Sequence, residues 1–366
     1  MLMPITRINI GPIHPSTHGV LRLVVDLDGD TIMNVEPHIG FLHRGVEKLV
    51  ENRLYMQSHV YMEKMDYAAP LSEDELFVST VEAAMGIEVK ERAQYIRVVL
   101  LEMQRLASHL LWLGTMCNDI GQLFTVFMWA FADRDMVIRL LEAATGSRMF
   151  HVNMRLGGVI RDLPPDFDRH TLELMDYLEK RIKEYEDFLE KNPIFMERTK
   201  GIGTVSRAEA VNLGLSGPVL RASGVSYDVR SSYPYYVYEK LNFSPHYRNE
   251  GDCFARYKVR MLEMTESIKI VRMALGRMPE GDAAGMPVKL VMPPIKNREV
   301  HVRREMPRGE NAMYMIADNQ RPYRLSIRSS PFINLAALKY MSKGHKLADL
   351  FAILGSLDLV IADIDK

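Results

Sequence analysis

The feature that most constrains the fold of this chain is a long helical repeat that begins near Glu88. Across residues 89–113 apolar side chains recur every three or four positions, a spacing that predicts one long helix. Residues 107–118 contain no acidic residue, lysine or arginine, so the second half of this helix is expected to be buried on all sides. A second long helix is predicted over residues 122–145, ending at Gly146.

Strand patterns dominate the first part of the chain, residues 1 to about 42. Two apolar runs, residues 20–27 and 31–35, flank the tripeptide Asp-Gly-Asp at residues 28–30. A turn of this kind between apolar runs predicts a β-hairpin. Because the sequence contains no repeat, low-complexity tract or linker-like run, the whole chain is expected to form one closely packed body.

Three further helices are expected. Ser72 and Glu75 have the spacing of a capping box and predict a helix that ends near Gly86. Residues 168–192 and 252–275 each carry one apolar stripe at helical spacing. The rest of residues 168–192 is dense in Glu, Lys and Asp, which indicates a solvated face and not a binding tail.

The C-terminal part is expected to be less regular. Residues 277–332 are punctuated by Pro and Gly, with short β-prone pieces at 288–292 and 312–317. This region is therefore predicted to be irregular α+β. The tail, residues 334–366, is expected to hold a final helix and an apolar, strand-like run at 357–361.

The composition excludes several classes of function. With 46 Lys+Arg against 47 Asp+Glu, the net charge is −1, so the chain lacks the basic surplus that favours nucleic-acid binding. Its cysteines, Cys117 and Cys253, are too few for a Cys₄ cluster or a disulfide framework, and an intracellular setting is expected. No GxGxxG, GxxxxGK[ST], HExxH or GxSxG motif occurs, so binding of NAD or ATP by the usual loops is not expected.

A membrane-spanning segment is also not expected. The longest apolar stretch without a charge is the thirteen residues between Asp119 and Asp133, whereas a helix needs about 18 or more to span a bilayer. Pro4 and Arg7 interrupt the N-terminal stretch where a signal peptide would be apolar. The chain is expected to be soluble and able to dock on a membrane partner.

Histidines in an N-terminal loop are the first candidates for chemistry. His14 and His18 occur in the Gly- and Pro-rich segment GPIHPSTHG. They could ligate a metal, although the loop offers no acidic residue or cysteine as a further ligand. They could cap backbone groups, or one could act as an acid near neutral pH that delivers a proton to a reducible substrate. The spacing alone does not choose among these three hypotheses.

Three other polar residues stand out. Asp119 is a lone carboxylate in the most apolar part of the chain, so it must be paired, hydrogen-bonded or protonated, and an Arg or His is expected against it. Tyr67 could donate a hydrogen bond, although a tyrosine in apolar surroundings is more often a core residue. Arg44 stands at the mouth of a predicted helix, where an ion pair is the simplest role.

A set of unusual segments then points to a family. The segments GPIHPSTHGVLRL, EPHIGFLHRGVEKL, KMDYAAP, GSRMFHVNMRLGGV, EGDCFARYKVRMLEM, PRGE and LDLVIADIDK occur in this order. In residues 11–366 the chain resembles the D subunit of NADH:quinone oxidoreductase (respiratory complex I), a family related to the large subunit of [NiFe] hydrogenases.

The resemblance implies an α+β, mainly α fold: a hydrogenase-large-subunit-like helical bundle with a β-rich N-terminal part and an irregular C-terminal α+β region. The expected parts are a β-rich segment with quinone-site loops at residues 1–70, a central helical bundle at 71–200, and an α+β part packed on the bundle at 201–366.

The resemblance also implies that the hydrogenase metal centre is lost. Hydrogenase relatives hold nickel and iron through two Cys-x-x-Cys pairs, whose positions match Asp66, Ala69, Val360 and Asp363. None of the four is a cysteine, and soft thiolate ligation is what such a centre needs. We therefore expect this chain to hold no metal.

In the family, the vacated cavity receives a quinone headgroup. The motif residues taken to hydrogen-bond it match His18 and Tyr67, and a family aspartate that pairs with the histidine matches Asp119. The resemblance thus implies that His18, Tyr67 and Asp119 are the catalytic residues. Donors at the two quinone oxygens stabilise the charge that reduction creates and can supply protons.

The resemblance further implies a second group of residues beside a partner's cofactor. Arg44, His43 and His151 are expected near the terminal [4Fe–4S] cluster, which the small iron–sulfur subunit would hold. Lys64, where the family commonly has arginine, and Phe150, a histidine in some members, depart from the family pattern and leave the cluster potential and the quinone type open.

The expected partners are the small iron–sulfur subunit, the adjacent C subunit of the peripheral arm and the H subunit of the membrane arm at the quinone channel, with FMN and NAD also on partner subunits. The chain would then be a peripheral membrane protein on the cytoplasmic side of the cell membrane, in a proton-pumping complex.

Three alternatives stay open at this point. The chain could belong to a related complex that uses reduced deazaflavin or ferredoxin as donor and another membrane carrier as acceptor. It could be a scaffold that has lost the quinone site, although the joint presence of His18, Tyr67 and Asp119 argues against this. It could also be a hydrogenase-like protein with a soluble partner, which would not explain the intact quinone motif.

Overall fold

The computed structural model describes residues 5–13, 19–121, 124–287 and 294–366. The strands are β1 (Thr6–Ile10), β2 (Arg22–Asp28), β3 (Thr31–His38), β4 (Met154–Arg155), β5 (Gly158–Val159), β6 (Ile295–Met306), β7 (Gly309–Asn319) and β8 (Arg321–Arg328). The longer helices are α3 (Pro70–Met85), α4 (Glu91–Gly121), α5 (Phe124–Thr145), α6 (Phe167–Glu190), α11 (Cys253–Arg277) and α14 (Leu347–Leu357). The short helices are α1 (Val46–Glu51), α2 (His59–Met62), α7 (Pro193–Glu197), α8 (Arg207–Asn212), α9 (Gly217–Ala222), α10 (Val229–Ser232), α12 (Ser330–Leu335), α13 (Leu338–Ser342) and α15 (Ile361–Ile364), and the 3-10 turns are η1 (Tyr55–Gln57) and η2 (Tyr238–Lys240).

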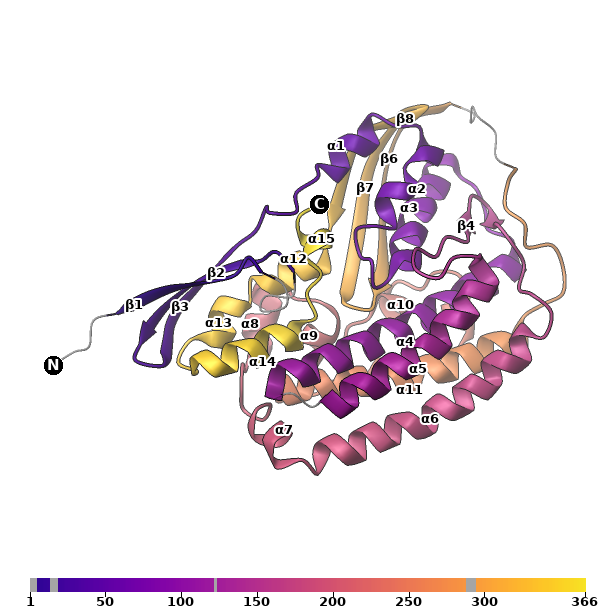
Figure 1. Ribbon diagram of the computed structural model, residues 1–366. Coiled ribbons are helices and arrows are strands. Elements are labelled where there is room, and N and C mark those ends of the chain that lie inside the picture. The colour runs from indigo at the N-terminus through magenta and orange to yellow at the C-terminus, as the bar shows by residue number, and fades with distance from the viewer. Residues whose placement is uncertain (1–4, 14–18, 122–123, 288–293) are drawn as a thin grey trace.

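The helical core is built around α4. This helix packs against α5, α11 and α14, and α6 lies against both α5 and α11, so that four long helices run side by side in the lower half of Figure 1. Residues 107–118 are buried apart from half-buried Leu111 and Thr115 and exposed Asn118. The predicted buried helix is therefore confirmed, and the predictions of a mainly α, α+β fold are confirmed with it.

The other large element is an antiparallel sheet in the order β6-β7-β8. Helix α3 packs on β6 and β7, and α1 packs on β8. The short β-prone piece predicted at residues 312–317 is part of strand β7 and is longer than expected, while the piece predicted at 288–292 lies outside the described residues. The sheet is hard to foresee because most side chains of residues 296–301 are charged or polar and face outward.

The N-terminal hairpin prediction is confirmed. Strands β2 and β3 pair around the turn at Gly29, whose φ of 63° is in the left-handed region that glycine adopts readily. Strand β1 adds to the outer edge of β2, and this sheet extends away from the rest of the molecule at the left of Figure 1. Its inner face packs near α13.

Two local predictions are wrong. Helix α3 begins at Pro70 with Ala69 as N-cap, so Ser72 lies inside the helix and forms no capping box. Proline at the first position is favourable there because its missing N–H would have no intrahelical acceptor. The run at residues 357–361 is not a strand, because α14 ends at Leu357 and α15 begins at Ile361.

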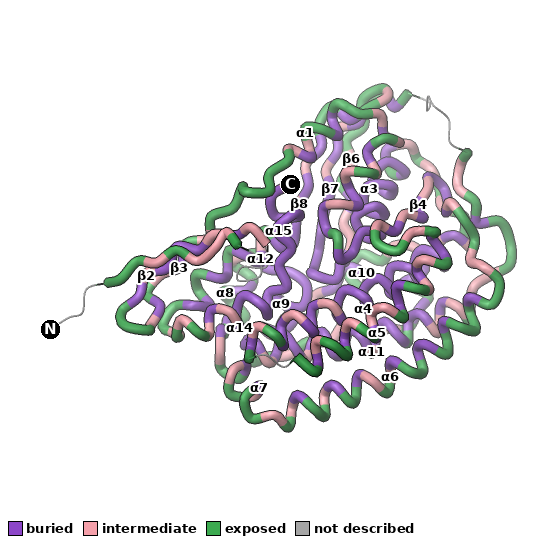
Figure 2. Tube along the Cα trace, in the orientation of Figure 1, coloured by how far each residue is buried: buried purple, intermediate pink, exposed green. Residues whose placement is uncertain are grey.

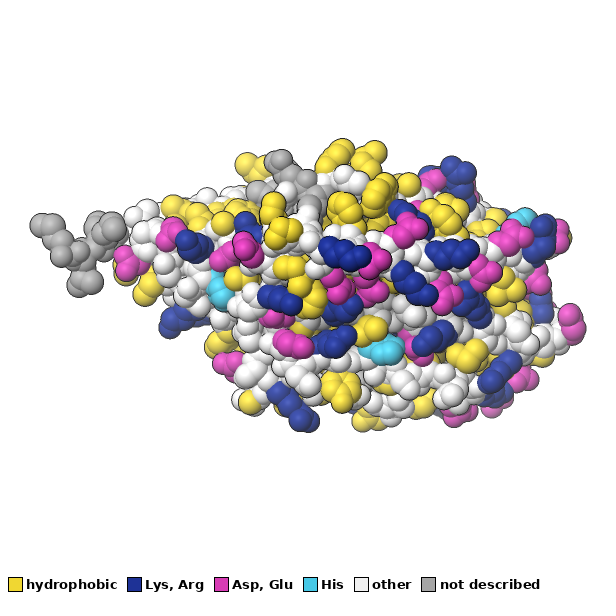
Figure 3. All heavy atoms as spheres, turned by 90° about the horizontal axis from the view of Figure 1, so that it is seen from below, with side chains coloured by type: hydrophobic (Ala, Val, Ile, Leu, Met, Phe, Trp, Pro, Cys, Tyr) yellow, Lys and Arg dark blue, Asp and Glu magenta, His cyan; other side chains and the backbone are white. Residues whose placement is uncertain are grey.

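The predicted helices over residues 168–192 and 252–275 are present as α6 and α11. Asp252 caps α11 by accepting a hydrogen bond from the N–H of Ala255 at 2.7 Å. The outer face of α6 is solvated, as expected: Figure 2 shows exposed residues alternating with buried residues along the helix. Acidic and basic side chains are interspersed over the face of the molecule seen in Figure 3. Within the described ranges, no helix is long and apolar enough to cross a membrane.

Candidate functional site

A cavity of about 320 Å³ lies where several distant segments meet. It is bounded by the segment before α3, by α4 and α5, by the β6–β7 turn and by the residues between α14 and α15. The lining residues are Tyr67, Ala68, Leu111, Trp112, Thr115, Phe127, Phe131, Arg308, Asp358, Leu359 and Val360. One predicted catalytic residue, Tyr67, and one predicted former ligand position, Val360, therefore share this cavity.

One wall of the cavity is aromatic. Phe127 and Phe131 on α5 stack with ring centroids 4.3 Å apart, and Phe124 stacks on Phe127 at 5.6 Å. Phe124 is 59% exposed, so this row of rings leads from the cavity to the surface of the chain. Stacked rings of this kind favour another planar, apolar group packed against them.

The opposite end of the cavity is charged. Arg308 is 2% exposed; its Nη1 donates to Asp66 Oδ2 at 2.6 Å and to Ser108 Oγ at 3.2 Å, and its Nη2 donates to Asp358 Oδ1 at 3.2 Å. A buried guanidinium needs such partners because an unpaired buried charge is costly. The Nε atom of Arg308 has no hydrogen-bond partner among the described residues.

Backbone geometry explains how Arg308 is held. The β6–β7 turn touches the start of α9 so closely that a Cβ on Gly217 would lie 2.3 Å from the Cα of Gly309. Only glycine fits at this contact. Asp358 caps α14 with φ 57° and ψ 60°, a left-handed conformation that aspartate tolerates better than most residues.

Tyr67 is 46% exposed in the isolated chain. Loss of solvent raises the pKa of its phenol, Arg308 opposes this, and the charges of Asp66 and Asp358 add to it. The phenol is thus held in its protonated, hydrogen-donating form around neutral pH. The alternative of a fully buried core tyrosine does not describe Tyr67.

His18 lies outside the described residues, and so does its predicted pairing with Asp119. Asp119 is half-buried near the end of α4. Its carboxylate lies against α14, where a Cβ on Gly355 would be 2.7 Å from Asp119 Oδ2. The carbonyl of the same Gly355 accepts a hydrogen bond from Trp112 Nε1 at 2.9 Å, so one backbone position contacts both Asp119 and a residue of the cavity wall.

The residues predicted beside the partner's cluster are placed as follows. His43 and Arg44 are exposed and meet the C-terminal segment: His43 Nδ1 is 3.2 Å from the carbonyl of Asp365, and Arg44 Nη2 donates to the carbonyl of Ala362 at 3.0 Å. Arg44 also contacts the carbonyl of Lys64 at 3.4 Å. Among the described residues, Arg44 makes these contacts to backbone carbonyls and not the expected ion pair.

His151 differs from these two because it is buried. Neither ring nitrogen has a hydrogen-bond partner among the described residues. Burial, assisted by the charge of Arg134, lowers the pKa of His151 to about 4. The imidazole is therefore neutral near pH 7 and carries no positive charge. The preceding residue, Phe150, receives the ammonium of Lys64 over its ring at 5.0 Å.

Three of the positions that the sequence analysis expected to correspond to hydrogenase ligands lie at or near the cavity. Asp66 binds Arg308, Val360 lines the cavity, and Asp363 is 1% exposed, with its charge acting on Asp66 and on Glu73. In the described part of the chain, no group of three or more His, Cys, Asp or Glu residues is arranged to hold a metal ion.

Several site residues were missed by sequence analysis. Arg308 and Asp358 occur in the segments PRGE and LDLVIADIDK, which indicated the family but were given no role. Phe127 and Phe131 were assigned only to a helix. The sequence gives no sign that Arg308 is buried, because its partner Asp66 lies 242 residues away.

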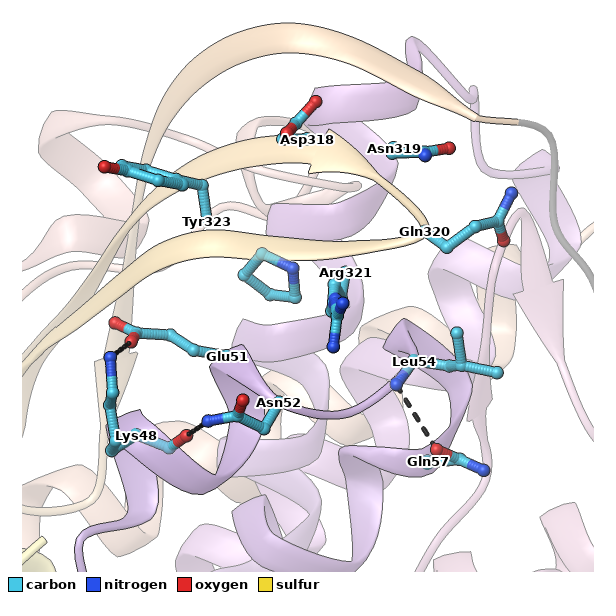
Figure 4. A pocket seen from close by; sticks show the side chains of 11 residues that line it. Lys48, Glu51, Asn52, Leu54, Gln57, Asp318, Asn319, Gln320, Arg321 and Tyr323 are labelled. Atoms are coloured by element: carbon cyan, nitrogen blue, oxygen red, sulfur yellow. Dashed lines mark hydrogen bonds and ion pairs between the residues drawn. The ribbon is translucent and has the colours of Figure 1, made fainter.

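A second cavity, of about 640 Å³, lies between α1, η1 and the β7–β8 turn. Figure 4 shows that its lining is mostly polar and that Lys48 pairs with Glu51 within it. It contains none of the predicted catalytic residues. Its chemistry is that of a hydrated surface groove, so the cavity at Tyr67 is the better candidate.

Comparison with known proteins identifies the class as one component of a quinone oxidoreductase complex. The matching family model is described as the respiratory-chain NADH dehydrogenase 49 Kd subunit and covers residues 119–299 and 289–366. The NADH-quinone oxidoreductase D subunit of Dehalococcoides mccartyi is 43% identical over 360 residues, 98% of each chain, and that of Citrifermentans bemidjiense is 41% identical over 390 residues, 100% of each chain. The chloroplastic NAD(P)H-quinone oxidoreductase H subunit of Marchantia polymorpha is 43% identical over 382 residues, 98% of this chain and 97% of the relative.

The chain belongs to the family of the 49 Kd subunit of respiratory-chain NADH dehydrogenase. The resemblance inferred from the ordered sequence segments is confirmed.

Proposed function

We propose that this chain forms the quinone-headgroup site of a respiratory NADH-quinone oxidoreductase and takes part there in reducing the quinone. The observation that carries the proposal is one cavity that joins a stacked aromatic wall to a protonated phenol backed by a buried arginine. A quinone is a planar ring with two acceptor oxygens, and it needs both features. The printed names of the relatives point to the same substrate.

The chemistry assigned to the chain is hydrogen bonding and proton supply. Reduction of a quinone to a quinol takes two electrons and two protons, and the electrons would come from the iron–sulfur cluster of the small partner subunit. The Tyr67 phenol is suited to donate to one quinone oxygen, because solvent exclusion favours its neutral form. We assign the second donor to His18, with Asp119 as the group that holds its proton.

Reduction would leave a charge to be redistributed. If His18 gives its proton to the quinol, Asp119 loses its counter-charge and must move or become protonated. Because Asp119 contacts α14 at Gly355, such a movement would change the packing of that helix against α4. This supplies a physical link between quinone reduction and proton pumping in the membrane partners.

The surroundings of the cavity suit closure by a partner. Beside it on α5, Phe124 is 59% and Met128 54% exposed. Neighbouring large apolar side chains that are exposed together often mark a surface that a partner covers. In Figure 3 hydrophobic side chains gather along the upper edge of the view. We propose that the small iron–sulfur subunit covers this region, with Arg44 and His43 near its cluster, and that the C and H subunits complete a peripheral arm on the cytoplasmic side of the membrane.

The test is the Tyr67→Phe variant in the assembled complex. Removing one hydroxyl leaves the packing almost unchanged, so the variant isolates a hydrogen bond. Quinone reduction by membranes is compared with electron transfer from the donor to an artificial acceptor upstream of the site. We expect quinone reduction to fall at least tenfold, the loss of about 1.4 kcal/mol or more of transition-state stabilisation, while the artificial acceptor is reduced at the normal rate.

Tyr177→Phe is the matched control, because it removes a tyrosine hydroxyl from α6 that donates to Asp133, on α5, at 2.9 Å. If Tyr67→Phe and Tyr177→Phe have the same small effect on quinone reduction, Tyr67 does not bind the headgroup and the proposed site is wrong.

A further inference from the structure

Three buried carboxyl groups lie close to one another and to Arg308, as their mutual electrostatic interactions show. Asp66 precedes α3, Glu73 is in the first turn of α3, and Asp363 is in α15. Their exposed fractions are 2%, 0% and 1%. We call Asp66, Glu73 and Asp363 the carboxyl cluster; the quinone chemistry proposed above does not use it.

Hydrogen bonds leave part of this cluster unsatisfied. Asp66 accepts from Arg308 at 2.6 Å and from the N–H of Ala68 at 3.1 Å. Glu73 Oε1 accepts from Asn311 Nδ2 at 2.8 Å, but Glu73 Oε2 and both carboxylate oxygens of Asp363 have no hydrogen-bond partner among the described residues. Buried polar atoms are nearly always hydrogen-bonded, so these three oxygens require an explanation.

The charges around the cluster are also unbalanced. Arg308 is shared between Asp66 and Asp358. The other cation that acts on Glu73 and Asp363 is Lys366, which is itself drawn toward Glu47 of α1 and repelled by Arg328 of β8.

Four buried carboxylates therefore face two cations in a medium of low polarity, and full ionisation would be costly. In agreement, burial followed by the neighbouring charge of Asp66 raises the pKa of Asp363 to about 6. The side chains of Ser329 and Asn311, which approach the carboxylate without reaching hydrogen-bond geometry, and the charge of Lys366 act in the opposite direction. Burial followed by the charge of Asp363 raises the pKa of Glu73.

We propose that Glu73 and Asp363 together bind one exchangeable proton when negative charge develops in the cavity. When negative charge appears at the quinone, a proton from solvent binds a carboxylate oxygen of the pair; when the neutral quinol has formed, that O–H bond breaks and the proton returns to solvent. No electron passes through the pair, and no bond to carbon changes. Arg308 lines the cavity and binds Asp66, and the charge of Asp66 acts on Glu73 and Asp363. Asp66 and Arg308 therefore connect the pair to the cavity. The inference rests on the proposed quinone site.

The test is redox-difference infrared spectroscopy of the purified complex, with and without bound quinone, in H₂O and D₂O. A protonated carboxylic acid has a carbonyl stretch that ionisation removes and that D₂O shifts. Followed in time through the reaction, the spectra should show such a band appear while the quinone carries negative charge and disappear once the quinol has formed, and only when quinone is bound. The change should be lost in both Asp363→Asn and Glu73→Gln.

The control is Glu51→Gln, because Glu51 is a buried carboxylate that is paired with Lys48 and Arg324. Its removal should leave the band unchanged. The inference is overturned if the unmodified complex shows no quinone-dependent carboxylic band, or if the band persists at full amplitude in both cluster variants. Should the amide variants fail to assemble, Asp363→Glu keeps a carboxyl group and must shift the band; an unshifted band there also overturns the inference.

This outcome is separable from that of the proposed function. If Tyr67→Phe leaves quinone reduction intact, the quinone site is wrong whatever the infrared result. If Tyr67→Phe abolishes quinone reduction while the band is indifferent to the cluster variants, only the proton-holding pair is wrong.

Discussion

Replacing Gly355 by alanine is a direct test of whether the position of Asp119 matters. The new Cβ would lie 2.7 Å from Asp119 Oδ2, whereas ordinary contacts begin at 3.4 Å. The carboxylate must therefore retreat by about 0.7 Å, or α4 and α14 must separate. The carbonyl of Gly355 also accepts the hydrogen bond of Trp112, so separation would disturb the cavity wall.

Overpacking of this kind costs about 1–3 kcal/mol, and the higher helix propensity of alanine offsets about 0.5–1 kcal/mol of it, which leaves a net cost of about 0.5–2 kcal/mol. Since each 1.4 kcal/mol is a factor of ten in an equilibrium, hydrogen exchange of the backbone amides in α14 should become about 2- to 30-fold faster. The assay is hydrogen–deuterium exchange of the assembled complex, read by mass spectrometry. Quinone reduction measured on the same preparation should fall, because the carboxylate assigned to hold His18 has moved.

A double-variant comparison isolates the cause. When Asp119 is alanine, the Gly355→Ala methyl group meets no carboxylate, so its effect on exchange should shrink to within about threefold. Gly276→Ala is the control, because a Cβ there has no heavy atom within 4 Å; it should slow exchange at the end of α11 slightly. The reasoning is refuted if Gly355→Ala exchanges at the unmodified rate, or if it accelerates exchange equally with and without Asp119.

Three further variants probe other parts of the site. Arg308→Met leaves Asp66 and Asp358 without their shared cation and should destabilise the protein by about 3–5 kcal/mol, measured as loss of assembled complex, with Arg308→Lys intermediate. The pKa of His151 is about 4 in the folded chain instead of 6.5, so the folded state loses about 3 kcal/mol of stability as the pH falls from 6.5 toward 4. His151→Phe should remove this acid sensitivity, measured by hydrogen exchange as a function of pH. Between about pH 7 and 8 the residue is neutral in both states, so it should contribute no pH dependence there. Gly114→Ala would put a Cβ 3.2 Å from the ring of Phe131, so the KM for quinone should rise more than kcat falls; an unchanged KM would contradict the role of that ring in the cavity.

The parts of the fold that could be predicted from the sequence are those with a strong apolar period. Helices α4 and α6 each show such a period, one uncharged in its second half and one amphipathic, and the structure has both. Strand β6 could not be predicted because most side chains of residues 296–301 point outward, and those positions have no apolar alternation. Its partner β7 follows directly after a turn at residues 307–308, so the signal that was missing is the one for the strand itself.

The same distinction holds for the candidate site. Tyr67 and Asp119 attract notice locally, the first in a quoted motif and the second as a charge among apolar residues. Arg308 does not, because its role depends on Asp66 and Asp358, which are 242 and 50 residues away. No periodic or spacing pattern encodes such a meeting, so the charged end of the cavity emerges only from the tertiary structure.

Asp66 and Asp363, which the sequence analysis expected at former metal-ligand positions, show what buried carboxylates require when no metal is held. In a metal site, anionic ligands surround a cation. Where there is neither a metal nor thiolate ligands, a carboxylate that is buried in the same place needs another counter-charge. At Asp66 that charge is the guanidinium of Arg308, 2.6 Å away. Asp363 has no cation at hydrogen-bond distance in the described chain, and its raised pKa makes a proton the available substitute. Asp66 is thus balanced by a fixed cation, and Asp363 would be balanced by an exchangeable proton suited to a reaction that consumes protons.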